Sequence, residues 1–264
     1  MLQEQAIIIK HENFQGDYRV LHMNAPKIGP LVTPGQFIHL KVPKLNDRIL
    51  RRPFSVYKAD DETVTLLYKP VGRGTETMIT LNENDSVDII GPLGNGYPEA
   101  QPEKFPVLVA GGYGNAALYL KAKELKNKGV AFFGGQTAQD ILCVNEFEEL
   151  GWDVRCSTND GSLGVKGLIT DAIHPWMKEQ KVSNLEFFVC GPGPMLHAIG
   201  DLAITHNFTA WLSLDENMVC GVGACLTCVI KIKEDDGWKW ARCCKDCLLY
   251  TSPSPRDVEE SRMP

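Results

Sequence analysis

The fold of this chain is indicated most clearly by the segment Phe105-Pro106-Val107-Leu108-Val109-Ala110-Gly111-Gly112-Tyr113-Gly114. It begins with a short continuous apolar run, which is typical of a strand buried on both faces of a parallel sheet. The glycines that follow permit a tight turn, and Leu118, Ala122 and Leu125 then recur with helical spacing before Gly129, the expected end of the helix. The stretch predicts the first unit of an α/β nucleotide-binding domain, although a plain strand–helix turn has the same pattern.

Downstream of this stretch, apolar strands and helices continue to alternate. Strands are expected at 130–133, 154–157, 185–190 and 209–214, and helices at about 165–176 and 194–207. Such alternation implies right-handed βαβ units and therefore a parallel sheet. We expect this nucleotide-binding α/β domain to cover residues 101–214.

Upstream of it, the first hundred residues show no helical pattern. Strands are expected at 5–10, 18–23, 36–42, 62–69 and 86–90, separated by clusters of Gly, Pro and Asn. Short, evenly spaced strands with turn residues between them predict a small antiparallel barrel, here over residues 1–100. The fold class is therefore β followed by α/β.

The composition is that of a globular protein, with 264 residues, 44% apolar and 23% charged, and the length suggests about two domains. The net charge of −6 gives no basic footprint for nucleic acid, and no apolar run is long enough for a membrane-spanning helix. The first residues lack the basic segment of a signal peptide. With nine cysteines, these features lead us to expect a cytoplasmic protein with reduced thiols.

Six of the nine cysteines crowd into the last part of the chain. Cys220, Cys225 and Cys228 follow the spacing C-x4-C-x2-C, and a fourth cysteine follows at Cys243 or Cys244. This is the plant-type spacing of [2Fe–2S] ligands, whereas zinc and purely structural cysteines remain the alternatives. Residues 215–246 are too few to bury a core of their own, so we expect a metal centre to hold them. The two cysteines of the α/β domain, Cys143 and Cys156, are expected to be ordinary buried thiols.

Three further segments are candidates for binding a nucleotide or a flavin. Cys190-Gly191-Pro192 ends an expected strand, at the sheet edge where α/β domains bind ligands. In Arg51-Arg52-Pro53-Phe54-Ser55, the Arg52 and Ser55 side chains can hold a pyrophosphate or a flavin edge. Gly72-Arg73-Gly74-Thr75-Glu76 offers backbone N–H groups and a hydroxyl to a phosphate. Each of these segments alone also fits an ordinary turn.

The order of these motifs along the chain resembles the ferredoxin–NADP reductase superfamily. Within it, the spacing is most similar to the electron-transfer subunits of type B dihydroorotate dehydrogenases, over about residues 1–246. The resemblance implies a six-stranded FAD-binding barrel, an NAD-binding α/β domain and a small C-terminal [2Fe–2S] domain.

Site residues follow from the resemblance by matching motifs. The FAD-binding positions would be Arg52, Pro53, Phe54, Ser55, Leu67, Tyr68, Lys69, Gly74 and Thr75. Lys69 stands where the family usually has Arg, and it would meet a phosphate as a point charge without the bidentate fork. The NAD-binding positions would be Gly111, Gly112, Gly114, Cys190, Gly191 and Pro192, with Cys190 beside the nicotinamide. The cluster ligands would be Cys220, Cys225, Cys228 and Cys244, with Cys243 as the alternative fourth ligand.

The resemblance also implies a function in pyrimidine biosynthesis. An FMN-containing catalytic subunit would oxidise dihydroorotate, and electrons would pass through the [2Fe–2S] cluster and FAD to NAD+, in a heterotetramer with two of each subunit. NAD is favoured over NADP because Gly134–Asp140 contains no Arg or Lys to meet a 2′-phosphate. The alternatives are a related flavin and iron–sulfur reductase serving a hydrogenase or a glutamate synthase-like partner, and a metal-stapled redox-sensing or binding protein.

The end of the chain departs from the family pattern. The family continues C-x-D-G-P-x-F after its last ligand, and Cys244-Lys245-Asp246 fits this, whereas Cys247–Pro264 does not. This last segment looks like translated vector sequence. We therefore expect residues 247–264 to be a non-native tail.

Overall fold

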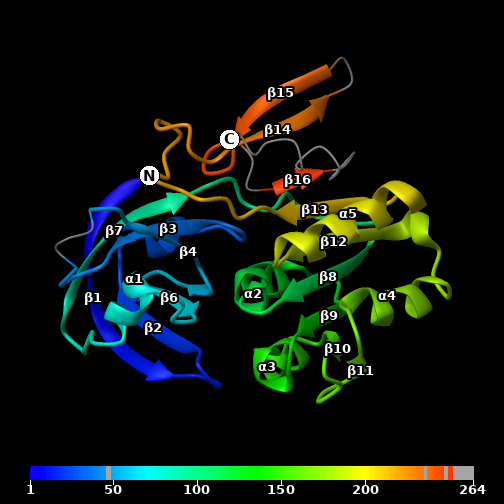
Figure 1. Cartoon of the computed structure of the whole chain (residues 1–264), viewed down its shortest axis with the longest axis horizontal. Coiled ribbons are helices and arrows are strands. Elements are labelled where there is room, and N and C mark those ends of the chain that lie inside the picture. Colours follow the sequence, from blue (N-terminus) through cyan, green and yellow to red (C-terminus); the bar gives the residue numbers. More distant parts are fainter. Residues whose placement is uncertain (46–48, 235–236, 247–248, 252–264) are drawn as a thin grey trace.

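The computed structural model describes residues 1–45, 49–234, 237–246 and 249–251. It contains two seven-stranded sheets and a two-stranded hairpin. In Figure 1 the N-terminal sheet curls at the left, the second sheet with its helices lies at the right, and the hairpin stands above them. The predicted order of a β part, an α/β part and a small C-terminal part along the chain is therefore confirmed.

The N-terminal sheet is antiparallel, with the strand order β4-β3-β7-β1-β2-β6-β5. Its outline matches the expected barrel, with six longer strands and the two-residue β5. Alternate residues of β7 face inward, so apolar side chains at every second position form one core inside the curled sheet. The elements of this part are β1 (Leu2–Asn13), β2 (Arg19–Asn24), η1 (Gly29–Leu31), β3 (Phe37–Lys41), β4 (Arg52–Ser55), β5 (Lys58–Ala59), β6 (Thr63–Tyr68), α1 (Arg73–Met78) and β7 (Ser86–Leu93).

Strand β4 was not expected, because Arg51, Arg52 and Pro53 indicate a polar turn. It lies at the edge of the sheet and pairs with β3 alone. A proline is tolerated on an edge strand because its missing N–H removes no bond from the interior of the sheet. The predicted flavin segment is therefore part of the sheet rather than a loop.

The second sheet has the order β11-β10-β9-β8-β12-β13-β16 and is parallel except at β16. Helices α2 and α3 cover one face and α4 and α5 the other, so the strands are buried on both sides as predicted. The elements are β8 (Phe105–Gly111), α2 (Gly114–Glu124), β9 (Val130–Gly135), η2 (Ala138–Asp140), α3 (Val144–Glu149), β10 (Asp153–Thr158), β11 (Val165–Lys166), α4 (Ile169–Met177), η3 (Val182–Asn184), β12 (Leu185–Cys190), α5 (Gly193–His206), β13 (Thr209–Ser213) and β16 (Leu249–Thr251).

Two expected helix boundaries are wrong. Helix α2 ends at Glu124, and Gly129 instead lies so close to β8 that a Cβ there would be 1.9 Å from the carbonyl oxygen of Pro106. Helix α4 begins at Ile169 rather than near Val165, because Gly167 has a φ of 131° that no helix accommodates. Glycine thus serves close packing in the first place and a chain reversal in the second.

The C-terminal part shares a hydrophobic core with the barrel. Strands β14 (Val229–Glu234) and β15 (Gly237–Arg242) form an antiparallel hairpin between Cys228 and the last cysteines of this part. Their buried residues pack together with Phe37 and Leu93 from the outer side of the barrel. This agrees with the expectation that residues 215–246 cannot bury a core alone.

Most of the expected non-native tail, 247–264, lies outside the described residues, Cys247 included. The three described residues, Leu249–Thr251, form β16 beside β13. In the ranges that the structure describes, no helix is both long and apolar enough to cross a membrane.

Candidate functional site

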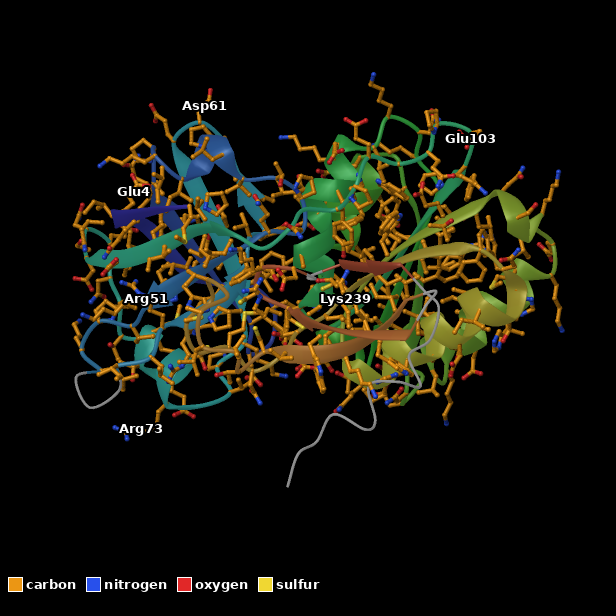
Figure 2. All side chains as sticks on the ribbon, turned by 90° about the horizontal axis from the view of Figure 1, so that it is seen from above. Glu4, Arg51, Asp61, Arg73, Glu103 and Lys239 are labelled. Carbon is orange, nitrogen blue, oxygen red and sulfur yellow. The ribbon has the colours of Figure 1, made fainter. Side chains whose placement is uncertain are left out.

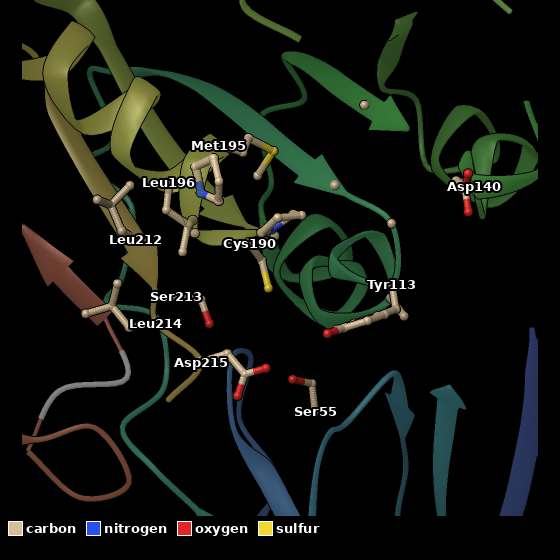
Figure 3. A pocket seen from close by; sticks show the side chains of 18 of the residues that line it. Ser55, Tyr113, Asp140, Cys190, Met195, Leu196, Leu212, Ser213, Leu214 and Asp215 are labelled. Atoms are coloured by element: carbon tan, nitrogen blue, oxygen red, sulfur yellow. The ribbon is translucent and has the colours of Figure 1, made fainter. Parts of the chain in front are cut away.

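A single cavity of about 1030 Å³ runs between the barrel, the carboxyl edge of the parallel sheet and the C-terminal hairpin. Its size is at the upper end of the range for small-molecule sites. Figure 3 shows Ser55 from the barrel facing Cys190, Ser213 and Asp215 from the parallel sheet and its edge. The cavity therefore brings together segments that are far apart in the sequence.

Nearly every residue predicted to bind a flavin lines the barrel side of the cavity. Phe54 and Tyr68 meet edge to face, with ring centroids 5.9 Å apart, and form an aromatic wall. Gly74 does not line the cavity, but it backs Arg52, since a Cβ there would lie 2.8 Å from the arginine Nε. The predicted residues that line the cavity are Arg52, Pro53, Phe54, Ser55, Leu67, Tyr68, Lys69 and Thr75.

The two neighbouring arginines have different surroundings. Arg51 donates to both the carboxylate of Asp88, at 2.7 Å, and the Asp88 carbonyl oxygen, at 2.8 Å, which binds the chain to β7. Figure 2 shows Arg51 on the barrel side of the molecule. Among the residues that the structure describes, Arg52 donates to nearby carbonyl groups, chiefly that of Leu50 at 2.8 Å, and it lines the cavity. Arg52 is thus the arginine available to an anion in the cavity.

The hydroxyl of Thr75 is engaged within its own loop. It accepts from the N–H of Val71 at 2.9 Å and of Gly72 at 3.3 Å, and donates to the Gly72 carbonyl oxygen. These bonds shape the loop before α1, and the contact of the Thr75 hydroxyl with a phosphate stays a prediction.

Lys69 connects the barrel to the parallel-sheet domain. Its ammonium nitrogen lies 3.5 Å from the Asp140 carboxylate and 5.0 Å from the centre of the Tyr18 ring. The Tyr18 hydroxyl donates to the same carboxylate at 3.1 Å. Burial would raise the pKa of Asp140, but the N–H of Thr137, the Tyr18 hydroxyl and the Lys69 charge together hold it below its usual value. All three side chains line the cavity.

The predicted nucleotide-binding edge of the parallel sheet, which we call the nucleotide edge, comprises Gly111–Gly114 and Cys190–Pro192. Its glycines let two strand–helix turns approach each other. A Cβ at Gly111 would lie 2.7 Å from Pro192, and one at Gly114 would lie 2.2 Å from the Cys190 carbonyl oxygen. Gly114 is therefore a packing residue and does not line the cavity. The predicted residues that do line it are Gly111, Gly112, Cys190, Gly191 and Pro192. Helices α2 and α5 both begin here, so their N-terminal N–H groups are available to a pyrophosphate.

Cys190 ends β12 and lies opposite Ser213 on β13. Burial raises the pKa of the Cys190 thiol to about 12, against a hydrogen bond with Ser213 that lowers it. The group is therefore a neutral thiol at pH 7, suited to pack against a ring rather than to attack it. Of the two thiols predicted to be buried, Cys143 is buried and Cys156 is only partly buried, and burial raises their pKa values to about 12 and about 11.

Several residues of the cavity were missed in the sequence. Asp215 follows β13, and burial raises the pKa of its carboxyl group. Its position directly after the carboxyl end of a parallel strand is the signal that would have identified it. Tyr113, which is about half exposed, precedes α2 and faces the same space. Tyr18, just before β2, and Phe37, on β3, also line the cavity, but no motif surrounds either residue.

The cysteines of the C-terminal part lie in two pairs, and Cys220 and Cys225 form the first. The Cys220 sulfur accepts from the N–H groups of Val222, Ala224 and Cys225, at 3.2 to 3.4 Å. Hydrogen bonds with Thr227 and then with Cys220 lower the pKa of the Cys225 thiol to about 6.

The second pair is Cys228 and Cys244. The N–H of Cys244 points to the Cys228 sulfur at 3.5 Å, and the N–H of Gly223 points to the Cys244 sulfur at 3.1 Å. Cys243 precedes Cys244 and is fully buried. Within the described ranges, no three His, Cys, Asp or Glu side chains are arranged around a single metal ion.

Comparison with known proteins identifies the C-terminal part and the whole chain. Residues 215–246 match the family described as the iron-sulfur cluster binding domain of dihydroorotate dehydrogenase B. A relative from Geobacillus sp. (strain WCH70), named "Dihydroorotate dehydrogenase B (NAD(+)), electron transfer subunit", is 36% identical over 251 residues, or 92% of this chain and 95% of the relative. One of the same name from Caldanaerobacter subterraneus subsp. tengcongensis is 38% identical, over 82% of this chain and 84% of the relative.

Solved structures agree with this assignment. The structure of an NADH-dependent reduced ferredoxin-NADP oxidoreductase has a TM-score of 0.80 and 27% identity, over 94% of this chain and 88% of that one. Phthalate dioxygenase reductase shares the fold, with a TM-score of 0.65 and 17% identity, over 92% of this chain and 94% of that one. The chain belongs to the family of electron transfer subunits of dihydroorotate dehydrogenase B (NAD(+)).

Proposed function

We propose that this chain carries electrons from an FMN-containing catalytic dihydroorotate dehydrogenase subunit, through a [2Fe–2S] cluster and FAD, to NAD+ in pyrimidine biosynthesis. The observation that carries the proposal is the continuity of one cavity. It is lined by the predicted flavin segment, by the nucleotide edge and by Ile230 and Ile232 of the cluster-side hairpin. Three groups that must exchange electrons can therefore lie next to one another.

The barrel side of the cavity fits FAD. Arg52 and Lys69 supply positive charge for a pyrophosphate, and Phe54, Leu67 and Tyr68 supply an apolar wall for a ring system. Ser55 places a hydroxyl at the mouth, facing the nucleotide edge. Lys69 meets its phosphate without the fork of the arginine usual in the family, and Asp140 and Tyr18 hold it in place.

The C-terminal loop fits a [2Fe–2S] cluster. Gly221 and Gly223 have positive φ values, of 69° and 82°, that let the loop fold back and aim N–H groups at the sulfurs. We assign Cys220, Cys225, Cys228 and Cys244 as ligands. Cys244 is favoured over Cys243 because its sulfur accepts from Gly223, inside the loop that carries the other three cysteines.

The sheet edge fits NAD. The N-termini of α2 and α5 face the space beside Gly111 and Gly191, where a pyrophosphate would be bound by backbone N–H groups. Asp140 contributes a negative charge after β9, which favours a ribose hydroxyl over a 2′-phosphate. We place the nicotinamide beside the neutral Cys190 thiol.

When bound, FAD would link one-electron transfer from the cluster to hydride transfer to NAD+, because a flavin supports both. The residues of this chain orient the reactants and exclude water. Cys190, Tyr113 and Leu214 form an uncharged wall between the two ring sites, and burial raises the pKa of the Asp215 carboxyl group beside them. Asp140, the partner of Lys69, lies away from Cys190 in Figure 3.

We propose a heterotetramer with two catalytic and two electron-transfer subunits, located in the cytoplasm. The eight cysteines in the described part of the chain form no disulfide, which is consistent with a reducing compartment.

The absorption spectrum of the anaerobically purified protein, with iron, sulfide and flavin assays, tests this proposal. We expect flavin and cluster bands that both bleach when NADH is added. A colourless protein that contains zinc would reject it in favour of a metal-stapled binding protein. A coloured protein that reduces a hydrogenase-type or glutamate synthase-like partner, but not the dihydroorotate subunit, would support the related reductase.

A further inference from the structure

His39 lies between the predicted flavin strand and the predicted cluster loop. It belongs to β3, where its neighbour across the sheet is Pro53 of β4. Ile38 and Leu40 face the barrel core, so His39 and Phe37 face the opposite side, where Phe37 packs into the C-terminal part. The two rings meet edge to face, with centroids 5.7 Å apart. His39 is therefore at the seam between the barrel and the cysteine-rich part.

The imidazole of His39 is buried and has no hydrogen-bond partner among the described residues. Its exposed fraction is 1%, and neither ring nitrogen is within hydrogen-bond reach of a protein group. A neutral imidazole carries one N–H donor and one acceptor nitrogen. A buried polar group left unpaired destabilises a fold by about 1 to 3 kcal/mol, so its presence calls for a partner that the chain itself does not provide.

The face of the ring is covered by Gly221, the residue after Cys220. A Cβ on Gly221 would lie 2.7, 2.8 and 2.9 Å from three atoms of the imidazole. Three nearly equal distances mean that the glycine lies over the ring rather than beside one edge. The three atoms are Cε1, Nε2 and Nδ1, so the part of the ring that carries both nitrogens lies against the backbone next to Cys220, and any side chain at position 221 would displace the ring.

We propose that His39 donates its N–H to a sulfur on the side of the cluster that the Cys220 loop holds, and so acts as a positioning residue that raises the cluster's reduction potential. This rests on the proposed function, because it requires the cluster. A hydrogen bond to a cluster sulfur stabilises the more negative, reduced form, and such bonds are among the determinants of iron–sulfur potentials. The same contact connects the cluster to the strand paired with the flavin segment.

The test uses the complete complex with its catalytic subunit and compares two variants. His39→Leu removes the donor and keeps an apolar volume, whereas His39→Gln keeps an N–H donor. Redox titration followed by electron paramagnetic resonance gives the cluster potential, while iron, sulfide and FAD contents show whether the cofactors are loaded. His22→Leu is the matched control, because His22 lies on the same sheet but on β2, where it hydrogen-bonds Thr65.

We expect His39→Leu to make reduction of a fully loaded cluster about tenfold less favourable, which is about 59 mV for one electron, and His39→Gln to recover most of this. An unchanged potential in a loaded His39→Leu complex would overturn the inference, as would equal shifts in the Leu and Gln variants. If the His39 variants do not load a cluster, the unaltered complex with ¹⁵N-labelled histidine decides. A weak nitrogen coupling to the reduced cluster in pulsed spectra supports the inference, and its absence overturns it. A lack of any cluster signal in the unaltered complex would instead reject the proposed function.

Discussion

The Asp140 carboxylate lies 3.5 Å from the Lys69 ammonium group and joins the parallel-sheet domain to the end of β6 in the barrel. The Tyr18 hydroxyl donates to the same carboxylate at 3.1 Å. A single acidic side chain thus holds the cation of the predicted flavin site and connects the two halves of the cavity. Because both members of the ion pair are partly exposed, their contribution to stability is moderate.

Asp140→Asn is expected to lower the free energy of unfolding by about 1 kcal/mol near pH 7, because it removes the charge partner of Lys69. The pKa of Asp140 is held below its usual value, so its stabilisation is present above the usual carboxyl pKa of about 4 and is lost as the pH falls below it. Urea unfolding at several pH values measures this. Asp153→Asn, which breaks a more exposed pair with Arg155, is the control. Equal effects of the two substitutions, or an effect of Asp140→Asn that persists at low pH, would contradict the prediction.

Gly114→Ala is expected to destabilise the protein by at least about 2 kcal/mol, although alanine is the better helix former. The added Cβ would lie 2.2 Å from the Cys190 carbonyl oxygen and force β12 and α2 apart. Gly193→Ala is the matched control, because Gly193 also begins a helix after a strand but has open space around it. Thermal unfolding of the two variants measures the difference, and a loss that is the same for both would show that close packing at Gly114 is not the cause.

We expect Arg51 to contribute mainly to stability and Arg52 mainly to flavin binding. Arg52→Ala should weaken FAD binding by about tenfold to a hundredfold, through loss of a charge-assisted bond, with little change in stability. Arg51→Ala should lower stability by about 2 kcal/mol through loss of its two bonds to Asp88, and leave FAD affinity nearly unchanged. Fluorescence titration of the apoprotein with FAD and urea unfolding give the two quantities. The reverse pattern would exchange the roles assigned to the two arginines.

Cys244→Ser is expected to abolish stable cluster binding, and Cys243→Ser to retain it with reduced stability, because Cys243 is fully buried. Iron and sulfide content after anaerobic purification measures the outcome. Cys156→Ser, in the α/β domain, controls for loss of any thiol. Retention of two iron atoms per chain by Cys244→Ser together with their loss from Cys243→Ser would assign the fourth ligand to Cys243.

Removal of residues 247–264 is expected to leave iron, sulfide and FAD contents unchanged. The chain is fastened just before this point, where Arg242 donates to the Asp246 carboxylate at 2.6 and 2.8 Å. Loss of the cluster from the shortened protein would show that the tail is part of the fold. Comparison with Asp246→Ala, which cuts that attachment, separates the two contributions.

The sequence was sufficient for the order of the β, α/β and C-terminal parts, and the segments that it singled out in the first two parts meet around one cavity. Apolar runs between glycines predicted β8, β9, β12 and β13, and the spacing of Cys220, Cys225 and Cys228 predicted the loop that the structure forms. These features are local, because burial of a strand and the wrapping of a loop are set by residues close to one another in the chain.

What the sequence did not predict depends on contacts between distant segments. Strand β4 can contain Pro53 because it lies at the edge of the sheet. The residue types of Arg52 and Pro53 do not indicate that position. The closeness of Gly129 to Pro106, and of Gly221 to His39, has no local pattern, since a glycine that serves packing looks like one that serves a turn. The same holds for Asp140, whose role depends on Lys69 in another domain.

Transfer of electrons across this chain, from a dihydroorotate-oxidising partner to NAD+, can be measured directly as NADH formation by the assembled complex. The purified chain, loaded with FAD and cluster, is mixed anaerobically with the FMN-containing catalytic subunit, dihydroorotate and NAD+. We expect NADH formation that requires both subunits and dihydroorotate, and that is lost with Cys244→Ser. Dihydroorotate oxidation by the complex without any NADH formation, although FAD and cluster are both present, would contradict it.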